Sequence, residues 1–427
     1  MNHKHAIECV GRTFRDMMPQ LQPGGPNYTP DAKDKPFGGK IVIFGGDFRQ
    51  VLPVIQKASK AQVIAASLKN SYIWRHVHTM PLHLNMRVRK GLQLCPKCMA
   101  LPFDNLENAI CNTCAPMLQK QMEFETFLLK MGDGKLPHPT NNHWDYKVEL
   151  PSQCLAPAGA EMFHLVTKVF ADMPTKWQDA EYMCSRCVLS PLNAHVDKIN
   201  DFMMERFPST NQRTYKSIDT VPNDQAMLFT TEFLNDQRDG GMPPHQLTLK
   251  THAPVILLRN LDTSIGLCNG TRLTIVALHK RFVEACIVTG LPMNVGRIVA
   301  IPRINFTSDD MPFDMTRYQF PFKPAFALTI NKSQGQTLKE VGLYLPDPVF
   351  SHGQLYVAFS RVSSLEHIQV LIENTKKQKK LVSLPNQPNA TVEPLERQTS
   401  TANVVYPEVL WRCGSHQPPK HSITHKL

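Results

Sequence analysis

The sequence lacks one motif, and its absence excludes one kind of phosphate-binding site. None of its 427 residues form Gly-x-x-x-x-Gly-Lys-Ser/Thr, the phosphate-binding loop (Walker A) of P-loop nucleotide hydrolases. The nearest text is Gly38-Gly39-Lys40-Ile41, which has neither a spaced glycine nor a hydroxyl after the lysine. It also precedes a predicted strand, whereas a phosphate loop follows one. The sequence therefore contains no phosphate cradle of this kind.

Long apolar runs are also missing. No run approaches the roughly 18 residues that a membrane helix needs, and the first residues, Met1-Asn2-His3-Lys4-His5, lack the apolar core of a signal peptide. We therefore expect a soluble intracellular chain. Its 11 cysteines are an odd number, and in a cytosolic or nuclear protein we expect reduced thiols or metal ligands instead of disulfides.

The composition fits a folded chain of two or three domains. Hydrophobic residues make up 42% of the sequence, which excludes wholesale disorder, and 34 prolines predict many loops. The net charge of +11 favours a polyanionic partner, although only weakly, because the positive charge forms no single basic stripe.

Hydrophobic periodicity predicts an α/β part interrupted by a β region. Helical patterns cover 3–18, 56–76, 121–131, 161–171 and 193–207. Continuous apolar runs at 41–44 and 187–190 are typical of strands buried on both faces of a parallel sheet. From about residue 230 the period changes to two, with short strands at 254–258, 273–278, 284–288 and 297–301. We expect a small β domain inserted between two halves of an α/β domain.

Three segments place polar groups at junctions next to predicted strands, where open α/β sheets bind ligands. Asp47 and Gln50 follow the run at 41–44 and could face a phosphate or its attacking water. Asn331 to Thr337 offers a lysine, hydroxyls and amides that suit phosphates. Arg361, between a helical stretch and a strand, could reach a transferring phosphoryl group. Taken singly, a solvated strand-to-turn junction and an ordinary surface ion pair are the simpler interpretations of Asp47 and Arg361.

Taken together and in order, these segments resemble the conserved motifs of the Pif-type DNA helicases, which are RecD-like, superfamily 1B enzymes. The matching text is Gly46-Asp47-Phe48-Arg49-Gln50-Val51-Leu52-Pro53-Val54, Leu84-Asn85-Met86-Arg87, Asn331-Lys332-Ser333-Gln334-Gly335-Gln336-Thr337 and Tyr356-Val357-Ala358-Phe359-Ser360-Arg361-Val362. Ala253 to Asp262, with Cys268 to Leu273, looks like the small inserted subdomain called 2B. The likeness is greatest to the helicase module of Helitron-type transposons, and residues 1–88 and 121–372 carry it.

The resemblance implies a fold and a set of roles. The fold is α/β, with RecA-like P-loop NTPase domains, the first one incomplete, and an inserted small β subdomain (2B, SH3-like). It implies ATP and Mg²⁺ as cofactors, DNA as partner, either single-stranded or as a duplex or fork junction, and 5′ to 3′ movement. Gln50, Arg87 and Arg361 would be catalytic, with Gln50 sensing the γ-phosphate and the arginines acting as fingers. Four residues would lie at the nucleotide: Gly46, Asp47, Gly335 and Gln336. Three would contact DNA: Ser333, Gln334 and Thr337.

By the same likeness, the chain divides into five parts. Residues 1–83 would be the C-terminal part of the first RecA-like domain (1A). Residues 84–230 would begin the second (2A), with a cysteine-bearing insert at 89–120. Residues 231–304 would form 2B and 305–372 the rest of 2A, followed by a disordered tail at 373–427. A nuclear location is expected, with a mitochondrial one as the family's alternative.

The family's Walker A and Walker B motifs have no counterpart in this sequence, since Met1 falls about where Walker B ends. We therefore expect a fragment of a helicase that does not hydrolyse ATP measurably by itself. A non-catalytic remnant that binds single-stranded nucleic acid is the alternative function. Repair, recombination, telomere and transposon contexts all fit the resemblance.

Two Cys-x-x-Cys pairs lie in the insert and depart from the family pattern. Cys95-Pro96-Lys97-Cys98 and Cys111-Asn112-Thr113-Cys114 are separated by twelve residues, which suits tetrahedral Zn²⁺. Unligated loop thiols, or translated sequence that is normally spliced out, are the alternatives. Cys184 and Cys187 have the same spacing but run into a predicted buried strand, so we expect them to be core cysteines.

Overall fold

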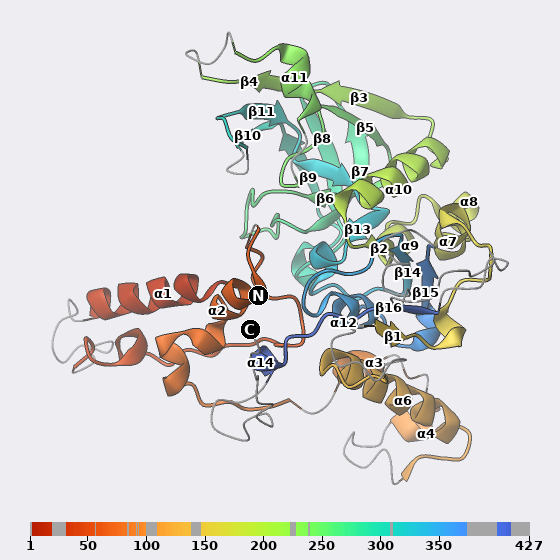
Figure 1. Cartoon of the computed structure of the whole chain (residues 1–427). Coiled ribbons are helices and arrows are strands. Elements are labelled where there is room, and N and C mark those ends of the chain that lie inside the picture. Colours follow the sequence, from red (N-terminus) through yellow and green to blue (C-terminus); the bar gives the residue numbers. More distant parts are fainter. Residues whose placement is uncertain are drawn as a thin grey trace, which may run out of the picture.

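A computed structural model describes residues 2–18, 31–55, 57–82, 85–90, 92, 94–99, 109–137, 147–222, 228–237, 240–307, 311–373 and 399–410. Its largest part joins a parallel sheet to a β region, and the amino-terminal helices project beside them (Figure 1). No helix in these ranges is both long and apolar enough to cross a membrane.

A four-stranded parallel sheet forms the centre of the α/β part. Its order is β13 (Ala327–Thr329), β2 (Arg186–Ser190), β14 (Glu340–Leu345) and β15 (Ile368–Ile372). The predicted strand at 187–190 is confirmed, and Cys187, Val188 and Leu189 are fully buried because the sheet is covered on both faces.

Helices cover the two faces of this sheet with separate hydrophobic cores. Val188 faces a core that includes side chains of α7 (Met162–Val169) and α10 (Asn193–Arg206). Its neighbours along the strand, Cys187 and Leu189, face a core shared with α6 (Ala115–Gly132) and α12 (Gln354–Phe359). This three-layer arrangement is the doubly wound pattern expected of a RecA-like domain.

The β region is inserted between two strands that are neighbours in the parallel sheet. Its main antiparallel sheet has the order β12 (Phe322–Pro324), β6 (Pro254–Leu257), β7 (Arg272–Leu278), β8 (Phe282–Ile287) and β9 (Ile298–Pro302). Two smaller sheets join β3 (Gln212–Lys216) to β5 (Gln246–Lys250), and β10 (Ile304–Thr307) to β11 (Thr316–Gln319) and β4 (Ile218–Thr220). The strands therefore extend on both sides of the expected 231–304.

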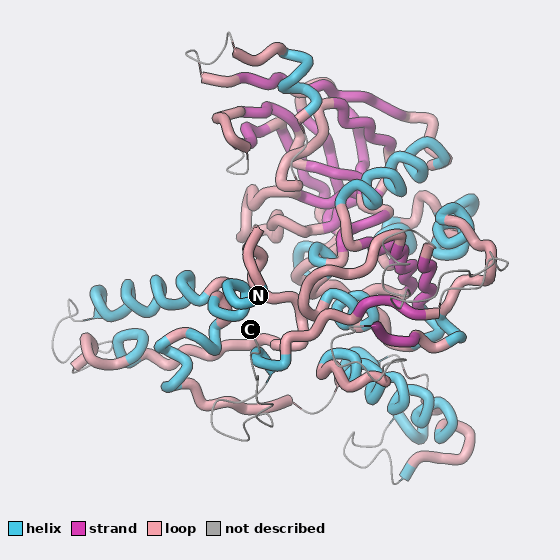
Figure 2. The backbone as a smooth tube through the Cα atoms, viewed as in Figure 1, coloured by secondary structure: helices cyan, strands magenta, loops and turns pink. Residues whose placement is uncertain are grey.

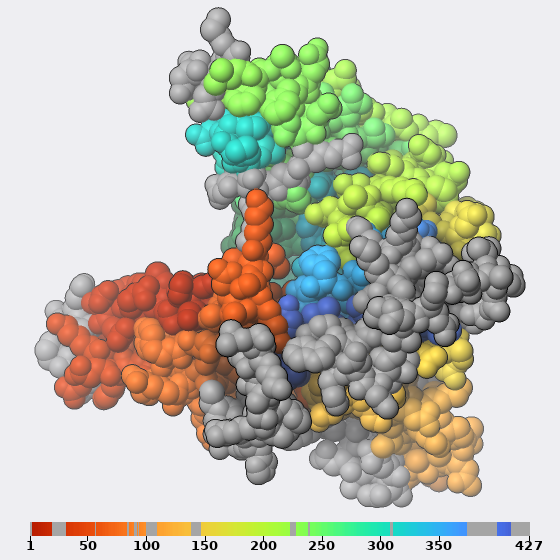
Figure 3. Space-filling view, viewed as in Figure 1, coloured from red at the N-terminus to blue at the C-terminus, as the bar shows by residue number. Residues whose placement is uncertain are grey.

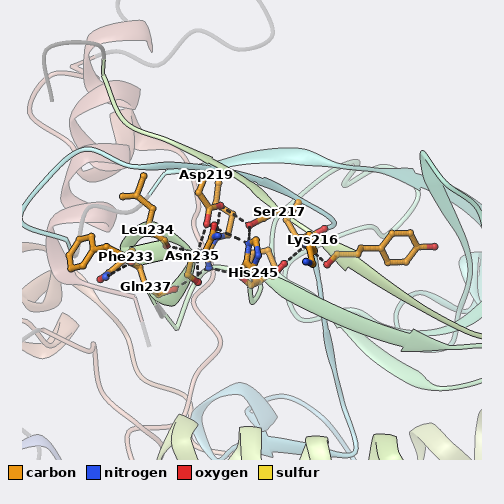
Figure 4. A network of polar contacts seen from close by, with 12 residues as sticks. Lys216, Ser217, Asp219, Phe233, Leu234, Asn235, Gln237 and His245 are labelled. Atoms are coloured by element: carbon orange, nitrogen blue, oxygen red, sulfur yellow. Dashed lines mark hydrogen bonds and ion pairs between the residues drawn. The ribbon is translucent and has the colours of Figure 1, made fainter. Parts of the chain in front are cut away.

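Two buried arginines stabilise the β region, one by joining it to the α/β part and the other by joining its own elements. Arg272 donates to the carbonyl oxygens of Cys184 at 2.7 Å and Ala325 at 2.7 Å, which ties β7 to the α/β part. Arg317 forms a two-point contact with Asp219, at 2.9 and 2.7 Å, and both side chains are buried. Arg317 also donates to the Leu234 carbonyl in α11 (Thr231–Asp236). Figure 4 shows Asp219 close to Ser217 and His245, so this network joins β4, β11 and α11.

The amino-terminal part is helical and projects as an arm (Figures 2 and 3). Helix α1 (Lys4–Met17) confirms the predicted helix at 3–18. The predicted helix at 56–76 is divided into α2 (Lys60–Ala65), η3 (Leu68–Asn70) and η4 (Tyr72–His76). Ser59, Ser67 and Ser71 each accept from a backbone N–H at the start of a turn, and such local bonds compete with one continuous helix.

The expected strand at 41–44 is wrong. Residues 41–44 have no regular structure, and Ile41 and Ile43 are 94% and 84% exposed. A buried parallel strand needs a neighbouring strand on each side to bond its backbone. No strand among the described residues pairs with this segment.

Short elements complete the fold. The helices are α3 (Met86–Lys90), α4 (Pro96–Met99), α8 (Met173–Lys176), α9 (Ala180–Cys184) and α14 (Pro407–Leu410). The 3₁₀ turns are η2 (Pro36–Gly39), η6 (Ser152–Cys154), η7 (Pro292–Asn294), η8 (Asn331–Ser333) and η9 (Leu365–His367).

Part of the expected disordered tail is folded. Strand β16 (Ser400–Ala402) pairs antiparallel with β1 (Lys147–Glu149), and Val405 and Val409 are buried. The expectation of disorder is therefore wrong for 399–410, because these few apolar residues complete a core that the sequence of the tail alone does not reveal. Residues 374–398 and 411–427 lie outside the described ranges.

Candidate functional site

The motif segments meet beyond the end of β13, at the carboxyl edge of the parallel sheet. The chain turns there through η8 into the exposed Gly335, whose φ of 85° suits glycine. Gly353, the residue that precedes helix α12, lies nearby. A side chain at Gly353 would overlap the carbonyl oxygen of Arg49, so this glycine lets the segment around Asp47 approach the helix. Residues more than 280 positions apart in sequence thus form one site.

Several polar contacts connect the segment around Asp47 to the α/β part, two of them through the predicted site residues. The Tyr356 hydroxyl donates to Oδ2 of Asp47 at 2.9 Å. The Gln334 amide donates to Oε1 of Gln50 at 2.9 Å, while the Gln50 amide is 3.4 Å from Asp47. Burial raises the pKa of Tyr356, and the Asp47 carboxylate raises it further, which keeps the phenol protonated as the donor. Tyr356 was not singled out from the sequence, although it lies within a quoted motif.

Arg87 and Arg361 lie close together, Arg361 buried and Arg87 partly exposed. Arg361 is 1% exposed and donates to the carbonyl oxygens of Val357 at 2.8 Å and Gln336 at 3.0 Å. Arg87 donates to the hydroxyl of Thr337 at 3.0 Å and the carbonyl of Ser360 at 2.7 Å. Burial lowers the pKa of Arg361 to about 10, with a further contribution from the Arg87 charge. Within the described part of the chain, neither arginine has a carboxylate within 4.0 Å.

The remaining predicted residues differ in how accessible they are. Ser333 is fully buried and donates to the Ile330 carbonyl at 2.7 Å, so its hydroxyl faces inward. Thr337 is exposed, and Gly46 has an open backbone, with no atom within 4 Å of the position that a Cβ would take. A cavity of about 560 Å³ borders the loop. It is lined on the loop side by Lys332, Gln334, Gly335, Gln336 and Thr337, and on the other by Asn269, Gly270, Thr289 and Gly290.

Residues that the sequence analysis did not name stabilise the position of the Asp47 segment. Arg49 and Asp133 form an ion pair at 2.7 Å, which joins the Asp47 segment to the end of α6. His352 contacts the Phe48 carbonyl at 2.8 Å and accepts from the backbone N–H of Tyr406 at 2.8 Å. Burial lowers the pKa of His352, which favours the neutral ring. No motif in the sequence signals these long-range contacts.

The four cysteines of the insert form a second site, separate from the first. The structure brings together Cys95, Cys98, Cys111 and Cys114, whose sulfur atoms all lie within 4.8 Å of one another. Cys184 and Cys187 are buried in the α/β part, as predicted.

Two family models match separate regions of the chain. The family described as PIF1-like helicase matches residues 1–142, and the family described as DNA helicase Pif1, 2B domain, matches residues 232–278. The ATP-dependent DNA helicase PIF1 of Xenopus laevis is 28% identical over 340 residues, which cover 79% of this chain and 42% of that protein. The human ATP-dependent DNA helicase PIF1 is 31% identical over 195 residues, covering 43% of this chain and 27% of that protein.

The chain is therefore similar to PIF1-like helicases over residues 1–142 and to their 2B domain over residues 232–278. It spans less than half the length of these curated relatives.

Solved structures of PIF1-like helicases share the fold. Pif1 helicase from Candida albicans superposes with a TM-score of 0.50 at 21% identity, covering 90% of this chain and 73% of that one. Bacteroides Pif1 bound to ssDNA superposes with a TM-score of 0.52 at 19% identity, covering 90% and 71%. The RecA-like architecture and the inserted 2B subdomain are therefore confirmed.

Proposed function

We propose that this chain forms part of the motor of an ATP-dependent DNA helicase that moves 5′ to 3′, with ATP and Mg²⁺ as cofactors and single-stranded DNA or a fork junction as partner. The curated relatives are named ATP-dependent DNA helicases. One structural relative, a Bacteroides Pif1 helicase, is in complex with ADP-AlF3 and ssDNA. A nuclear location and a role in repair, recombination, telomere maintenance or transposition belong to the same proposal.

One observation carries the nucleotide part of the proposal. Arg87 and Arg361 are partly or fully buried beside each other, and no carboxylate in the described residues neutralises them within 4.0 Å. Two desolvated guanidinium groups repel each other, so an anion between or beside them is favourable. A planar guanidinium suits phosphate oxygens, as arginine fingers do in nucleotide hydrolases.

The contact between Gln50 and Gln334 supports coupling between nucleotide and DNA. Gln50 would sense the γ-phosphate, while Gln334 belongs to a loop that borders the cavity toward the 2B subdomain. A change at the nucleotide that moves Gln50 therefore changes a hydrogen bond of that loop. By this proposal, Gln334 and Thr337 would pass the change to a bound DNA backbone.

We propose further that the 427-residue chain alone does not hydrolyse ATP measurably, because its sequence has no Walker A motif to cradle the phosphates. Phosphate release from the purified chain, with and without single-stranded DNA, tests this. Release is expected to stay at background in both. DNA-stimulated release that is lost in Arg361→Lys, a variant that keeps the charge and most of the packing, would contradict it.

DNA binding is tested separately. It distinguishes a non-catalytic chain that binds single-stranded nucleic acid from a chain that does not bind DNA. A fluorescently labelled single strand is titrated at about 50 and about 200 mM salt, and affinity is expected to fall at least about tenfold. The double variant Gln334→Ala/Thr337→Ala should weaken binding. Gln246→Ala, an exposed glutamine in β5, is the matched control and should leave it unchanged. Equal binding by all three proteins would contradict the placement of DNA at this loop.

A further inference from the structure

The cysteine cluster has the dimensions of a metal site. Its four sulfur atoms lie within 4.8 Å of one another, and those of Cys95 and Cys111 are 3.8 Å apart. Zinc–sulfur bonds of about 2.3 Å in a tetrahedron place neighbouring sulfurs about 3.8 Å apart. The separation is too long for a disulfide, whose sulfurs are about 2.05 Å apart. The four thiols are therefore spaced for a common ion.

Backbone donors reach the sulfur atoms of the cluster. The N–H of Cys95 donates to the sulfur of Cys114 at 3.3 Å, and the N–H of Cys111 donates to the sulfur of Cys98 at 3.4 Å. Each pair thus supplies a backbone donor to a sulfur of the other pair. Cys98 and Cys114 are only 1% and 4% exposed. Donors of this kind offset the negative charge that four thiolates would bring to one ion.

We propose that Cys95, Cys98, Cys111 and Cys114 bind one Zn²⁺ ion in a closed structural site. Four cysteine ligands fill the tetrahedral shell and leave no open position for a substrate, which assigns the ion a structural role. The proposal is independent of ATP and DNA, and it accounts for a pair of motifs that the helicase function does not use.

The ion fixes the start of α6. Cys114 is the residue that precedes the first turn of this 18-residue helix, and its side chain forms no capping hydrogen bond there. Through Cys98 and Cys114 the ion would link α4 to the start of α6.

Helix α6 in turn contacts two segments of the motif site. Glu125 accepts from the backbone N–H of Asn85, two residues before Arg87, at 3.1 Å. Phe127 packs edge-on against Phe359 of α12 at 5.6 Å between ring centres. The metal site therefore supports the helix from which the Arg87 segment is positioned.

Metal content of the full purified chain is the first test. Elemental analysis is expected to find about one zinc per chain, falling at least tenfold in Cys95→Ser/Cys98→Ser. Cys9→Ser, an exposed cysteine outside the cluster, is the matched control and should keep its zinc. A folded wild-type chain without zinc, iron in its place, or zinc retained in the double variant would each overturn the proposal.

A second measurement does not depend on the folding of a cysteine variant. Replacing the ion with Co²⁺ in the wild-type chain is expected to give the visible absorption of tetrahedral thiolate coordination. Chelation should then speed backbone hydrogen exchange at 115–122 while leaving 193–206 in α10 unchanged. Octahedral Co²⁺ absorption would contradict the ligand set. Unchanged exchange at 115–122 would contradict the role in fixing α6.

Discussion

Gly353 illustrates how one residue keeps two distant segments together. Its φ is 72°, and a Cβ there would overlap the Arg49 carbonyl oxygen. Gly353→Ala should therefore lower the free energy of unfolding through both a strained backbone and a steric overlap. Gly159 has a similar φ of 75° but open space around it, so Gly159→Ala isolates the backbone strain, about 1–2 kcal/mol.

Urea denaturation of the two variants checks this prediction. Gly353→Ala is expected to cost at least about 1 kcal/mol more than Gly159→Ala, because overpacking adds its own penalty. Equal losses would show that the segment around Arg49 moves away freely.

His352 predicts a pH dependence at the same junction. Burial lowers the pKa of its ring below the ordinary value of 6.5, so the unfolded chain takes up a proton that the folded chain does not. The stability that this histidine contributes is complete above pH 6.5 and is lost as the pH falls below it. The pKa of His367 is shifted in the opposite direction, because its hydrogen bond with Glu340 raises it. His367 is present in both the wild-type chain and the His352→Gln variant, so its contribution cancels in their comparison.

The measurement compares unfolding free energies at pH 7.5 and 5.5. The difference is expected to be larger in the wild-type chain than in His352→Gln, which cannot titrate. The same difference in both proteins would mean that His352 does not carry the effect.

At the scale of elements, apolar runs alone did not distinguish a strand from a loop. Residues 41–44 and 187–190 have the same pattern, yet only the second run is a strand. Its backbone bonds to β13 and β14 on either side. Residues 41–44 have no such neighbour among the described strands. The pattern reports apolar side chains, whereas a strand also requires partners that a single segment cannot specify.

The carboxyl-terminal segment at 399–410 gives an element-scale prediction. A chain that ends at Glu373 loses β16 and the buried side chains of Val405 and Val409. We expect its free energy of unfolding to fall by at least about 2 kcal/mol, from the apolar area that is no longer buried. A chain that ends at Leu410 keeps these contacts and should be the more stable of the two in thermal and urea unfolding. Equal stability of the two chains would show that the segment adds nothing.

At the scale of the whole molecule, the sequence motifs predicted which residues form the site, but not the contacts that keep these residues in position. Asp47, Gln50, Arg87, Gln334 and Arg361 were named from short motifs, and the fold brings them into one site. Their supports, such as the Arg49–Asp133 pair and the contact of His352 with Tyr406, were not predicted. These contacts join residues 84 and 54 positions apart and depend on the tertiary fold, which local patterns do not encode.

The joint made by Arg272 has a mechanical consequence. Its guanidinium is fully buried and joins the 2B subdomain to carbonyl oxygens on both sides of the insertion point, Cys184 and Ala325. Bending there would require breaking charged hydrogen bonds without water to replace them. A force on the distant strands of 2B would therefore be transmitted to the loop at 332–337, because 2B and the α/β part move together. The amino-terminal arm, by contrast, is joined at the motif site by the partly exposed side chains of Asp47, Arg49 and Gln50, whose polar contacts water can replace.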